Sequence, residues 1–291
     1  MNQVIEQMLR VYEARSLEDR RNAMKEVMQE IVLCGLSRAG FFDKAVFYGG
    51  TALRIFYGLD RFSEDLDFSP MEPFPAFRLQ SYLPILEREV QSFGLNVEIR
   101  EKEKTASSNI ETAFMKGNTK EHLLMFYPDS GIASGIAAGE AVKIKLVVDT
   151  APPRFAGFEH KYRLMPLPYA IGLYDMPTLF AGKIHAVLCR GWKNRVKGRD
   201  LYDYVFYLSR NAVYNPEHLR ERLVRSGCVG DGQVMTDGRV REMLCEHFTA
   251  IDFDQARKDV LPFIRNASML DMWSADFFVN ITQNLKPARE G

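Results

Sequence analysis

The chain lacks a net charge, and it has few cysteines. Its 38 lysine and arginine residues are balanced by 38 aspartate and glutamate residues, so no overall electric field attracts nucleic acid, and any nucleic-acid site must be a local patch. No two cysteines have the C-x-x-C spacing of a zinc or redox site. We therefore expect four reduced thiols of a cytoplasmic protein, without a disulfide framework. They are Cys34, Cys189, Cys228 and Cys245.

Long hydrophobic runs are absent as well. No stretch approaches the roughly 18 consecutive apolar residues that span a bilayer, and residues 1–10 mix polar and charged side chains. We expect neither a signal peptide nor a membrane partner. Repeats and low-complexity tracts are also missing. What the chain has is length, because 291 residues, 46% of them hydrophobic, suffice for two domains or one large one.

Strand patterns cluster in the first part of the chain, and helical periodicity dominates after Asp175. Expected strands are 45–48, 65–68, 96–100, 141–150, 161–165 and 169–173. Expected helices are 16–37, 51–57, 77–93, 177–190, 199–210, 216–226, 239–249, 253–263 and 274–285. This layout predicts an α+β fold, with an α+β domain over 1–174 and a mainly helical C-terminal lobe over 175–291.

The most informative stretch is YGGTALR at 48–54, followed by RFSEDLDF at 61–68. Side chains alternate along a strand, so Asp65 and Asp67 share a face. Neighbouring carboxylates repel each other unless a cation lies between them, and Mg²⁺ is usually held by one or two carboxylates plus substrate phosphates. We predict that this pair binds Mg²⁺; the alternative is a solvated strand end.

The glycine pair predicts a place for phosphate. Gly49 and Gly50 lack a Cβ atom, so a phosphate can approach the backbone closely. The helix that begins near Thr51 directs unpaired N–H groups and a positive dipole end toward it, and the threonine hydroxyl could add a contact. Arg61 and Ser63 could contact a triphosphate or only order the loop. A phosphate site beside a Mg²⁺-binding carboxylate pair indicates nucleotidyl transfer.

The strand at 141–150 offers a third carboxylate. By strand alternation Asp149 shares a face with Lys143 and Lys145. If that face adjoins the aspartate pair, Asp149 completes a metal-binding triad that includes a general base, because a ribose hydroxyl is a poor nucleophile until its proton leaves. The alternative is a turn residue before Pro152. Lys145 either neutralises phosphate or is a solvated strand residue.

Three stretches together support a resemblance. They are the segment 48–68, KIKLVVDT at 143–150, and KIHAVLCR at 183–190 with KGRDLYD at 197–203. Over residues 45–210 the chain resembles the AbiEii/AbiGii-type nucleotidyltransferases, toxins of bacterial abortive-infection toxin–antitoxin pairs, which are similar to the wider DNA polymerase β-like nucleotidyltransferase superfamily.

The resemblance implies a nucleotidyltransferase-fold mixed sheet with the glycine-pair helix packed on it. It also implies an NTP substrate, one or two Mg²⁺ ions, and transfer of a nucleoside monophosphate with release of pyrophosphate. The implied acceptor is RNA, the 3′ end of tRNA, whose modification stops translation. The implied partner is an antitoxin encoded nearby, typically a DNA-binding repressor.

The resemblance also implies roles in the second part of the chain. A lysine at the position of Lys183 and an aspartate of the R-D-x-x-D element matter for activity, so we expect Lys183 to contact the triphosphate and Asp203 to be part of the site. Asp200 and Asp203 share a helix face and could orient the lysine or an arginine, or bind the nucleotide; the alternative is a helix N-terminal acid pair. Relatives often carry an acid where Val147 stands.

A basic strip without acids runs from Lys183 to Arg199. It is a candidate surface for an RNA backbone, with Trp192 and Tyr202 as stacking surfaces, or else a solvated loop. Two other functions stay open: transfer to a small molecule or protein, and a catalytically silent nucleotide-binding or partner-binding module.

Overall fold

The chain folds into two compact units. The computed structural model describes residues 3–14, 16–101, 119–127, 142–190 and 196–289. Unit 1 comprises residues 1–52, 64–152 and 158–173, and unit 2 comprises residues 53–63, 153–157 and 174–291. Segments 53–63 and 153–157, which the expected boundary at 174/175 assigns to the first domain, therefore group with the helical unit.

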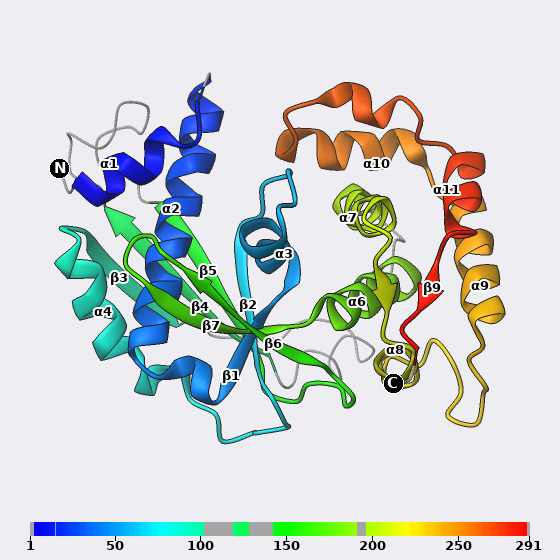
Figure 1. Cartoon of the computed structure of the whole chain (residues 1–291), viewed down its shortest axis with the longest axis horizontal. Coiled ribbons are helices and arrows are strands. Elements are labelled where there is room, and N and C mark those ends of the chain that lie inside the picture. The colour runs from blue at the N-terminus through cyan, green and yellow to red at the C-terminus, as the bar shows by residue number, and fades with distance from the viewer. Residues whose placement is uncertain (1–2, 15, 102–118, 128–141, 191–195, 290–291) are drawn as a thin grey trace. The chain divides into compact units, whose positions relative to one another are not determined.

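Within the described residues, the strands of unit 1 form one seven-stranded sheet in the order β3-β4-β5-β2-β1-β7-β6 (Figure 1). The pairing is parallel for β1–β7 and β2–β5 and antiparallel for β1–β2, β3–β4 and β4–β5. The predicted α+β fold with a mixed sheet is confirmed. The strands are β1 (Ala45–Tyr48), β2 (Asp65–Pro70), β3 (Asn96–Glu101), β4 (Thr119–Tyr127), β5 (Val142–Asp149), β6 (Phe158–Arg163) and β7 (Tyr169–Tyr174).

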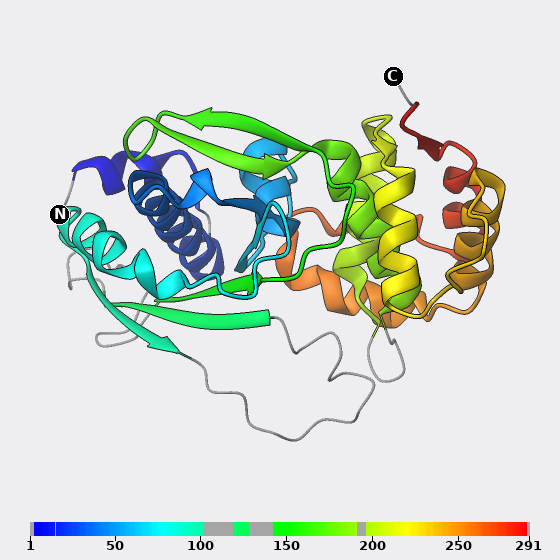
Figure 2. The same cartoon turned by 90° about the horizontal axis from the view of Figure 1, so that it is seen from below.

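Helix α2 (Leu17–Arg38) is the longest helix in the described part of unit 1, and it begins at the capping box that the sequence predicts. The Ser16 hydroxyl accepts a hydrogen bond from the Asp19 backbone N–H, and the Asp19 carboxylate accepts one from the Ser16 N–H. In Figure 2, α2 (blue) lies between the β6–β7 hairpin (green) and α4 (cyan). The other helices in the described part of unit 1 are α1 (Gln3–Arg10), η1 (Phe41–Asp43), α3 (Gly49–Tyr57), η2 (Leu79–Ser81) and α4 (Leu83–Ser92).

The core of unit 1 lies on one face of the sheet. Phe41, Phe47 and Phe68 are fully buried, and the ring of Phe68 contacts both of the others. Burying a side chain of this size contributes about 1.5–3 kcal/mol. Strand β5 alternates as predicted, because its even-numbered residues from Val142 to Val148 are buried and Lys143 is exposed. The odd-numbered face of β5 therefore turns away from the core.

Unit 2 is mainly helical. Asp175 is the N-cap of helix α6, and its carboxylate accepts a hydrogen bond from the Thr178 N–H, with Pro177 in the first turn as predicted. Phe180 and Tyr207 stack in the core, with ring centroids 4.5 Å apart. The helices are α6 (Met176–Cys189), α7 (Gly198–Ser209), α8 (Pro216–Arg225), α9 (Asp237–Thr249), α10 (Phe253–Val260), η3 (Leu261–Phe263), η4 (Ala267–Leu270) and α11 (Ala275–Thr282), and β8 (Val213–Tyr214) pairs with β9 (Lys286–Pro287).

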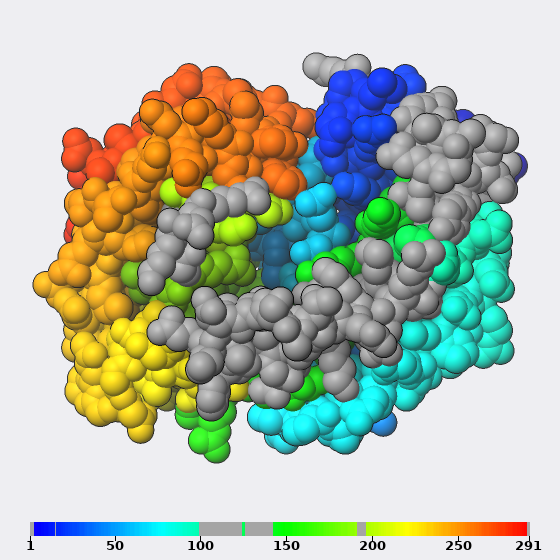
Figure 3. Space-filling model, turned by 180° about the vertical axis from the view of Figure 1, so that it is seen from behind, coloured from blue at the N-terminus to red at the C-terminus, as the bar shows by residue number. Residues whose placement is uncertain are grey.

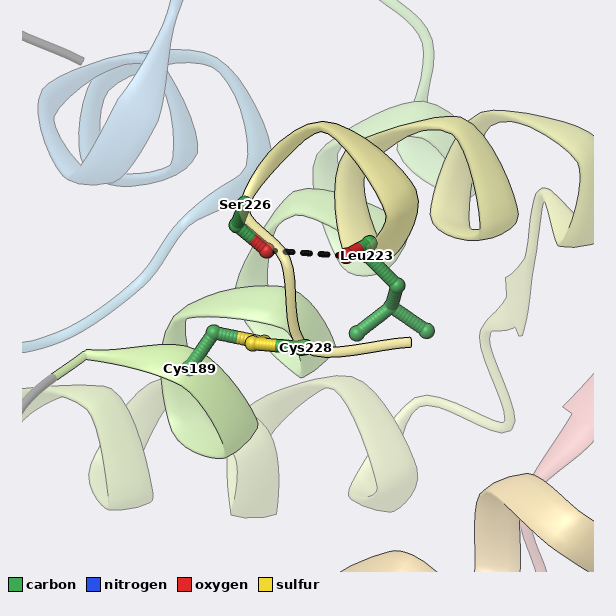
Figure 4. Close-up of a disulfide and its surroundings, with 4 residues drawn as sticks. All are labelled: Cys189, Leu223, Ser226 and Cys228. Atoms are coloured by element: carbon green, nitrogen blue, oxygen red, sulfur yellow. Dashed lines mark hydrogen bonds between the residues drawn. A yellow bond between two sulfur atoms is a disulfide. The ribbon is translucent and has the colours of Figure 1, made fainter. Parts of the chain in front are cut away.

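The expectation of four reduced thiols is wrong for two of the cysteines. Cys189, at the end of α6, forms a disulfide with Cys228, which follows α8 (Figure 4). The Cα atoms lie 6.2 Å apart although 39 residues separate the two cysteines. Packing of α6 against α8 brings the pair together, and linear spacing does not reveal such packing. Cys34 and Cys245 are free, as predicted.

Among the described residues, no helix is both long enough and apolar enough to cross a membrane.

Candidate active site

Strand β1 passes directly into helix α3 at Gly49. This residue has φ +84°, a conformation that favours glycine. A Cβ atom placed on Gly49 would lie 2.3 Å from Oδ2 of Asp67, so no larger residue fits without displacing that carboxylate. The approach follows from the antiparallel β1–β2 register, which pairs Tyr48 with Asp67. One predicted acid and the first predicted glycine are therefore in direct proximity.

The two acids of β2 lie on the face opposite the core. Leu66 and Phe68 are fully buried, whereas Asp65 is exposed and Asp67 is half-buried. The parallel register with β5 places Lys145 beside Asp65 and Val147 beside Asp67. The predicted sharing of a face is thus present, and Lys145 lies on that same face. We name Gly49, Gly50, Asp65 and Asp67 the glycine–aspartate site.

Asp149 does not complete a triad. It lies on the predicted face of β5 but two residues after Val147, the residue that pairs with Asp67. Its Oδ1 accepts a hydrogen bond from the Ala151 N–H at 3.0 Å, which is the turn arrangement considered as the alternative. In the part of the chain that the structure describes, no group of three or more His, Cys, Asp or Glu residues could hold a metal ion.

Thr51 and Arg61 have protein partners in place of phosphate. Thr51 is fully buried, and its hydroxyl donates to the Asp65 carbonyl oxygen at 2.5 Å, so it connects α3 to β2. Arg61 is 3% exposed and forms two hydrogen bonds with Asp203. Of the two roles expected for Arg61, the structure therefore supports the one in which it orders the loop. The Thr51 hydroxyl forms a hydrogen bond within the fold. Ser63 lies at the end of the segment 53–63, which belongs to unit 2.

Unit 2 contains a group of paired charges, which we name the charged cluster. Lys183 Nζ lies 2.7 Å from both Asp200 Oδ1 and Asp203 Oδ2. Arg61 contacts both oxygens of Asp203 at 2.6 Å, and Arg190 Nη1 lies 3.0 Å from Asp200 Oδ2. The cluster combines three cations and two carboxylates, so its net charge is +1. Asp200 and Asp203 therefore each pair with Lys183 and with one arginine.

Exposure changes across the charged cluster. The side chains of Asp203 and Arg61 are 0% and 4% exposed, that of Lys183 is 15% exposed, and that of Arg190 is 58% exposed. Atoms of α6 and α7 (yellow-green) reach the surface in the space-filling view of Figure 3. An anion can therefore approach Lys183 and Arg190 but not Arg61.

The cations lower the pKa of both cluster carboxylates. Burial alone raises the pKa of Asp200, but the charges of Lys183 and Arg190 outweigh it and lower the pKa to about 2. For Asp203 burial again raises the pKa, and Arg61 and Lys183 together bring it below its usual value. Both carboxylates are therefore ionised at neutral pH.

Sequence reasoning missed two contacts of the cluster. The Arg61–Asp203 pair joins residues that are 142 positions apart, and no periodicity reports such a distance. Arg190 was assigned only to a basic strip, whereas here it binds Asp200. The middle of that strip, residues 191–195 with Trp192, lies outside the described residues. Tyr202 is buried and donates to Asp60 Oδ1, so it is not a surface for stacking.

The residues of the glycine–aspartate site fit Mg²⁺ in kind. Carboxylate oxygens are the ligands that Mg²⁺ prefers, and two of them suffice when substrate phosphates and water complete the shell. The absent Cβ of Gly49 and the N-terminus of α3 leave space and N–H groups for a phosphate beside Asp67.

Comparisons with known proteins show solved structures of similar fold and one matching family model. Among solved structures, MenT4, a nucleotidyltransferase toxin from Mycobacterium tuberculosis, matches with TM-score 0.59 and 16% identity, over 98% of this chain and 88% of that chain. JHP933 from Helicobacter pylori matches with TM-score 0.49 and 18% identity, over 90% of each chain. No curated protein matches. The family model for the nucleotidyl transferase AbiEii toxin of type IV toxin–antitoxin systems matches residues 31–280. The chain therefore belongs to the AbiEii family of nucleotidyltransferase toxins.

Proposed function

We propose that this toxin is a Mg²⁺-dependent enzyme that transfers a nucleoside monophosphate from an NTP to an RNA hydroxyl, releasing pyrophosphate. The acceptor is the 3′ end of tRNA, so the transfer blocks translation in the cytoplasm. The observation that carries the proposal is the carboxylate of Asp67 against the Cβ-free surface of Gly49, with Asp65 on the same strand face. This pairing puts metal ligands next to a backbone site for phosphate.

The residues of each unit have separate roles in this proposal. In unit 1, Asp65 and Asp67 hold Mg²⁺, and Gly49 and Gly50 receive a phosphate on backbone N–H groups. Bound Mg²⁺ supplies charge stabilisation for the attacking and leaving oxygens. In unit 2, Lys183 is the compact cation for the triphosphate, because it is the partly exposed member of the cluster that lies between two carboxylates.

The test is a transfer assay with each of the four labelled NTPs, ATP, CTP, GTP and UTP, and total cellular RNA as acceptor. We expect Mg²⁺-dependent label at the 3′ end of tRNA with at least one NTP. Asp67→Asn should abolish the label. Asp43→Asn is the matched control, because Asp43 is an exposed carboxylate of the same unit outside the glycine–aspartate site.

Other outcomes would redirect the proposal. Label on a protein or a small molecule would reject RNA as the acceptor while keeping nucleotidyl transfer. Absence of transfer with all four NTPs, together with unchanged toxicity of Asp67→Asn in cells, would support a catalytically silent binding module.

Membership of a toxin–antitoxin family implies an antitoxin as partner. We propose that a neighbouring reading frame encodes it. Co-expression of that frame should restore the growth of cells that express the toxin, and continued growth arrest would reject that frame as the antitoxin gene.

A further inference from the structure

Arg61 is the buried cation of the charged cluster, where no ligand can touch it. Its Nε and Nη2 donate to the two oxygens of Asp203, and its Nη1 donates to the Phe62 carbonyl oxygen. Only 4% of its side chain is exposed. A guanidinium in this position acts on a substrate only through the groups that it holds.

Asp203 joins Arg61 to Lys183. It is fully buried, and its Oδ2 accepts from Arg61 Nη2 at 2.6 Å and lies 2.7 Å from Lys183 Nζ. A carboxylate without water needs cationic partners. Because Arg61 binds both oxygens of Asp203, the lysine ammonium is not its only counter-charge.

The charge count shows what Arg61 adds. With Arg61 the cluster has three cations for two carboxylates, and without it two cations for two carboxylates. The surplus positive charge exists only with Arg61. Lys183 and Arg190 are the cations at the exposed end, so a polyphosphate experiences that surplus there.

We propose that Arg61 is a positioning residue: it neutralises Asp203 from the buried side and so leaves the Lys183 ammonium available to a polyphosphate. This inference rests on the proposed function, in which Lys183 contacts the triphosphate. It differs from the triphosphate contact that the sequence suggested for Arg61, since the arginine itself touches no phosphate.

A purely structural role for Arg61 is the competing explanation, and the chain offers a matched control for it. The segment 60–62 is bonded to the rest of unit 2 at three consecutive residues: Tyr202 donates to Asp60, Arg61 donates to Asp203, and the Phe62 N–H donates to the Phe263 carbonyl oxygen. Tyr202→Phe removes one attachment without changing the charge count. Arg61→Met removes another and also the charge.

The experiment measures binding of inorganic tripolyphosphate with Mg²⁺ by calorimetry, without acceptor RNA and without turnover. Circular dichroism checks that each variant is folded. We expect Arg61→Met to weaken binding about tenfold or more, since a nearby unit charge is lost in a partly buried setting. Arg61→Lys keeps the charge but cannot form both hydrogen bonds to Asp203, so it should bind less tightly than wild type and clearly more tightly than Arg61→Met. Tyr202→Phe leaves the charge count unchanged and should bind within about threefold of wild type.

A double-mutant cycle tests whether Arg61 acts through Lys183. In a Lys183→Met background, Arg61→Met should cause little further loss, because the group that it positions is already gone. Additive losses would overturn the proposal, as would a loss in Arg61→Lys or Tyr202→Phe equal to that in Arg61→Met. If Arg61→Met does not fold, the Arg61→Lys result decides.

The failure of this inference is distinct from the failure of the proposed function. If wild type and folded Arg61→Met bind tripolyphosphate equally tightly, only the role of Arg61 is rejected. Wild-type protein that binds no tripolyphosphate rejects both.

Discussion

Each unit carries a pair of aspartates on one element, and the two pairs lie in opposite environments. On β2, Asp65 is exposed and Asp67 is half-buried, whereas Asp200 and Asp203 on α7 are 3% and 0% exposed. A buried carboxylate needs permanent cationic partners because water no longer stabilises its charge. A carboxylate at the surface stays within reach of an ion that arrives with the substrate. Short spacing between two acids therefore predicts proximity, and burial decides what the pair does.

Substituting Asp67 should separate activity from stability. We expect Asp67→Asn to lower nucleotidyl transfer about a thousandfold, because a metal ligand supports several kcal/mol of charge stabilisation in the transition state. Its free energy of unfolding should change by less than about 1 kcal/mol, because a half-buried surface carboxylate supports little of the fold. The transfer assay and urea unfolding measure the two effects, with Asp43→Asn as the control. If Asp67→Asn lost several kcal/mol of unfolding free energy together with its activity, Asp67 would be a structural residue like Asp203, and the contrast between the two aspartate pairs would not hold.

Substituting Asp203 should mainly affect the fold. Asp203→Asn leaves the buried Arg61 guanidinium without a counter-charge, and breaking such a pair costs about 3–5 kcal/mol. Urea unfolding should show this loss. Asp271→Asn, at an exposed position of the same unit, should change the free energy of unfolding by less than about 0.5 kcal/mol. A loss below about 1 kcal/mol for Asp203→Asn would mean that the cluster is not a permanent structural network.

Two glycines allow the Gly49 contact to be isolated. Gly49 has φ +84° and Gly94 has φ +74°, but a Cβ on Gly94 would meet nothing within 4 Å. Both alanine variants should lose about 1–2 kcal/mol from the left-handed backbone. Only Gly49→Ala displaces the Asp67 carboxylate, so it should lose about a further 1–3 kcal/mol and most of its activity. Urea unfolding and the transfer assay test this difference, and equal activity in the two variants would contradict the proximity of Gly49 and Asp67.

The pH dependence of stability should report the charged cluster. The folded pKa of Asp200 is about 2, below the unfolded value of about 3.9, and that of Asp203 is also lowered. Their contribution is therefore fully present above the unfolded pKa and is lost as the pH falls from about 4 toward about 2. Asp200 should account for about 2 kcal/mol of that loss. Urea unfolding across this window should show a shallower decline for Asp200→Asn than for wild type, and parallel curves would contradict the assignment.

Local patterns predicted most of the elements near the glycine–aspartate site. The capping box at Ser16, the alternation of β5, and the strand–helix–strand passage through Gly49 all depend on residues close in the chain. Elements that depend on distant pairing were missed. The two-residue strands β8 and β9 form only because Val213 pairs with Lys286, and no local signal marks either one. Strand β4 was also missed; it is placed by its pairing with β3 and β5.

The candidate site divides in the same way. Asp65 and Asp67 share a face because a strand has a period of two, whatever surrounds it. The distance of Asp149 from that pair depends on the register between β2 and β5, which puts Val147 beside Asp67. The predicted triad therefore failed at the step that required tertiary information.

The amino-acid sequence by itself determined the family, the order of the elements and the shared face of the acid pair, because these depend on residue type and short spacing. Only the tertiary structure decided the Cys189–Cys228 disulfide, the turn role of Asp149, and the burial of Arg61 against Asp203. The physical reason is that ion pairing and disulfide formation depend on distance and desolvation in space. Packing sets both distance and desolvation. It brings together two cysteines that are 39 residues apart and an arginine and an aspartate that are 142 residues apart in the chain.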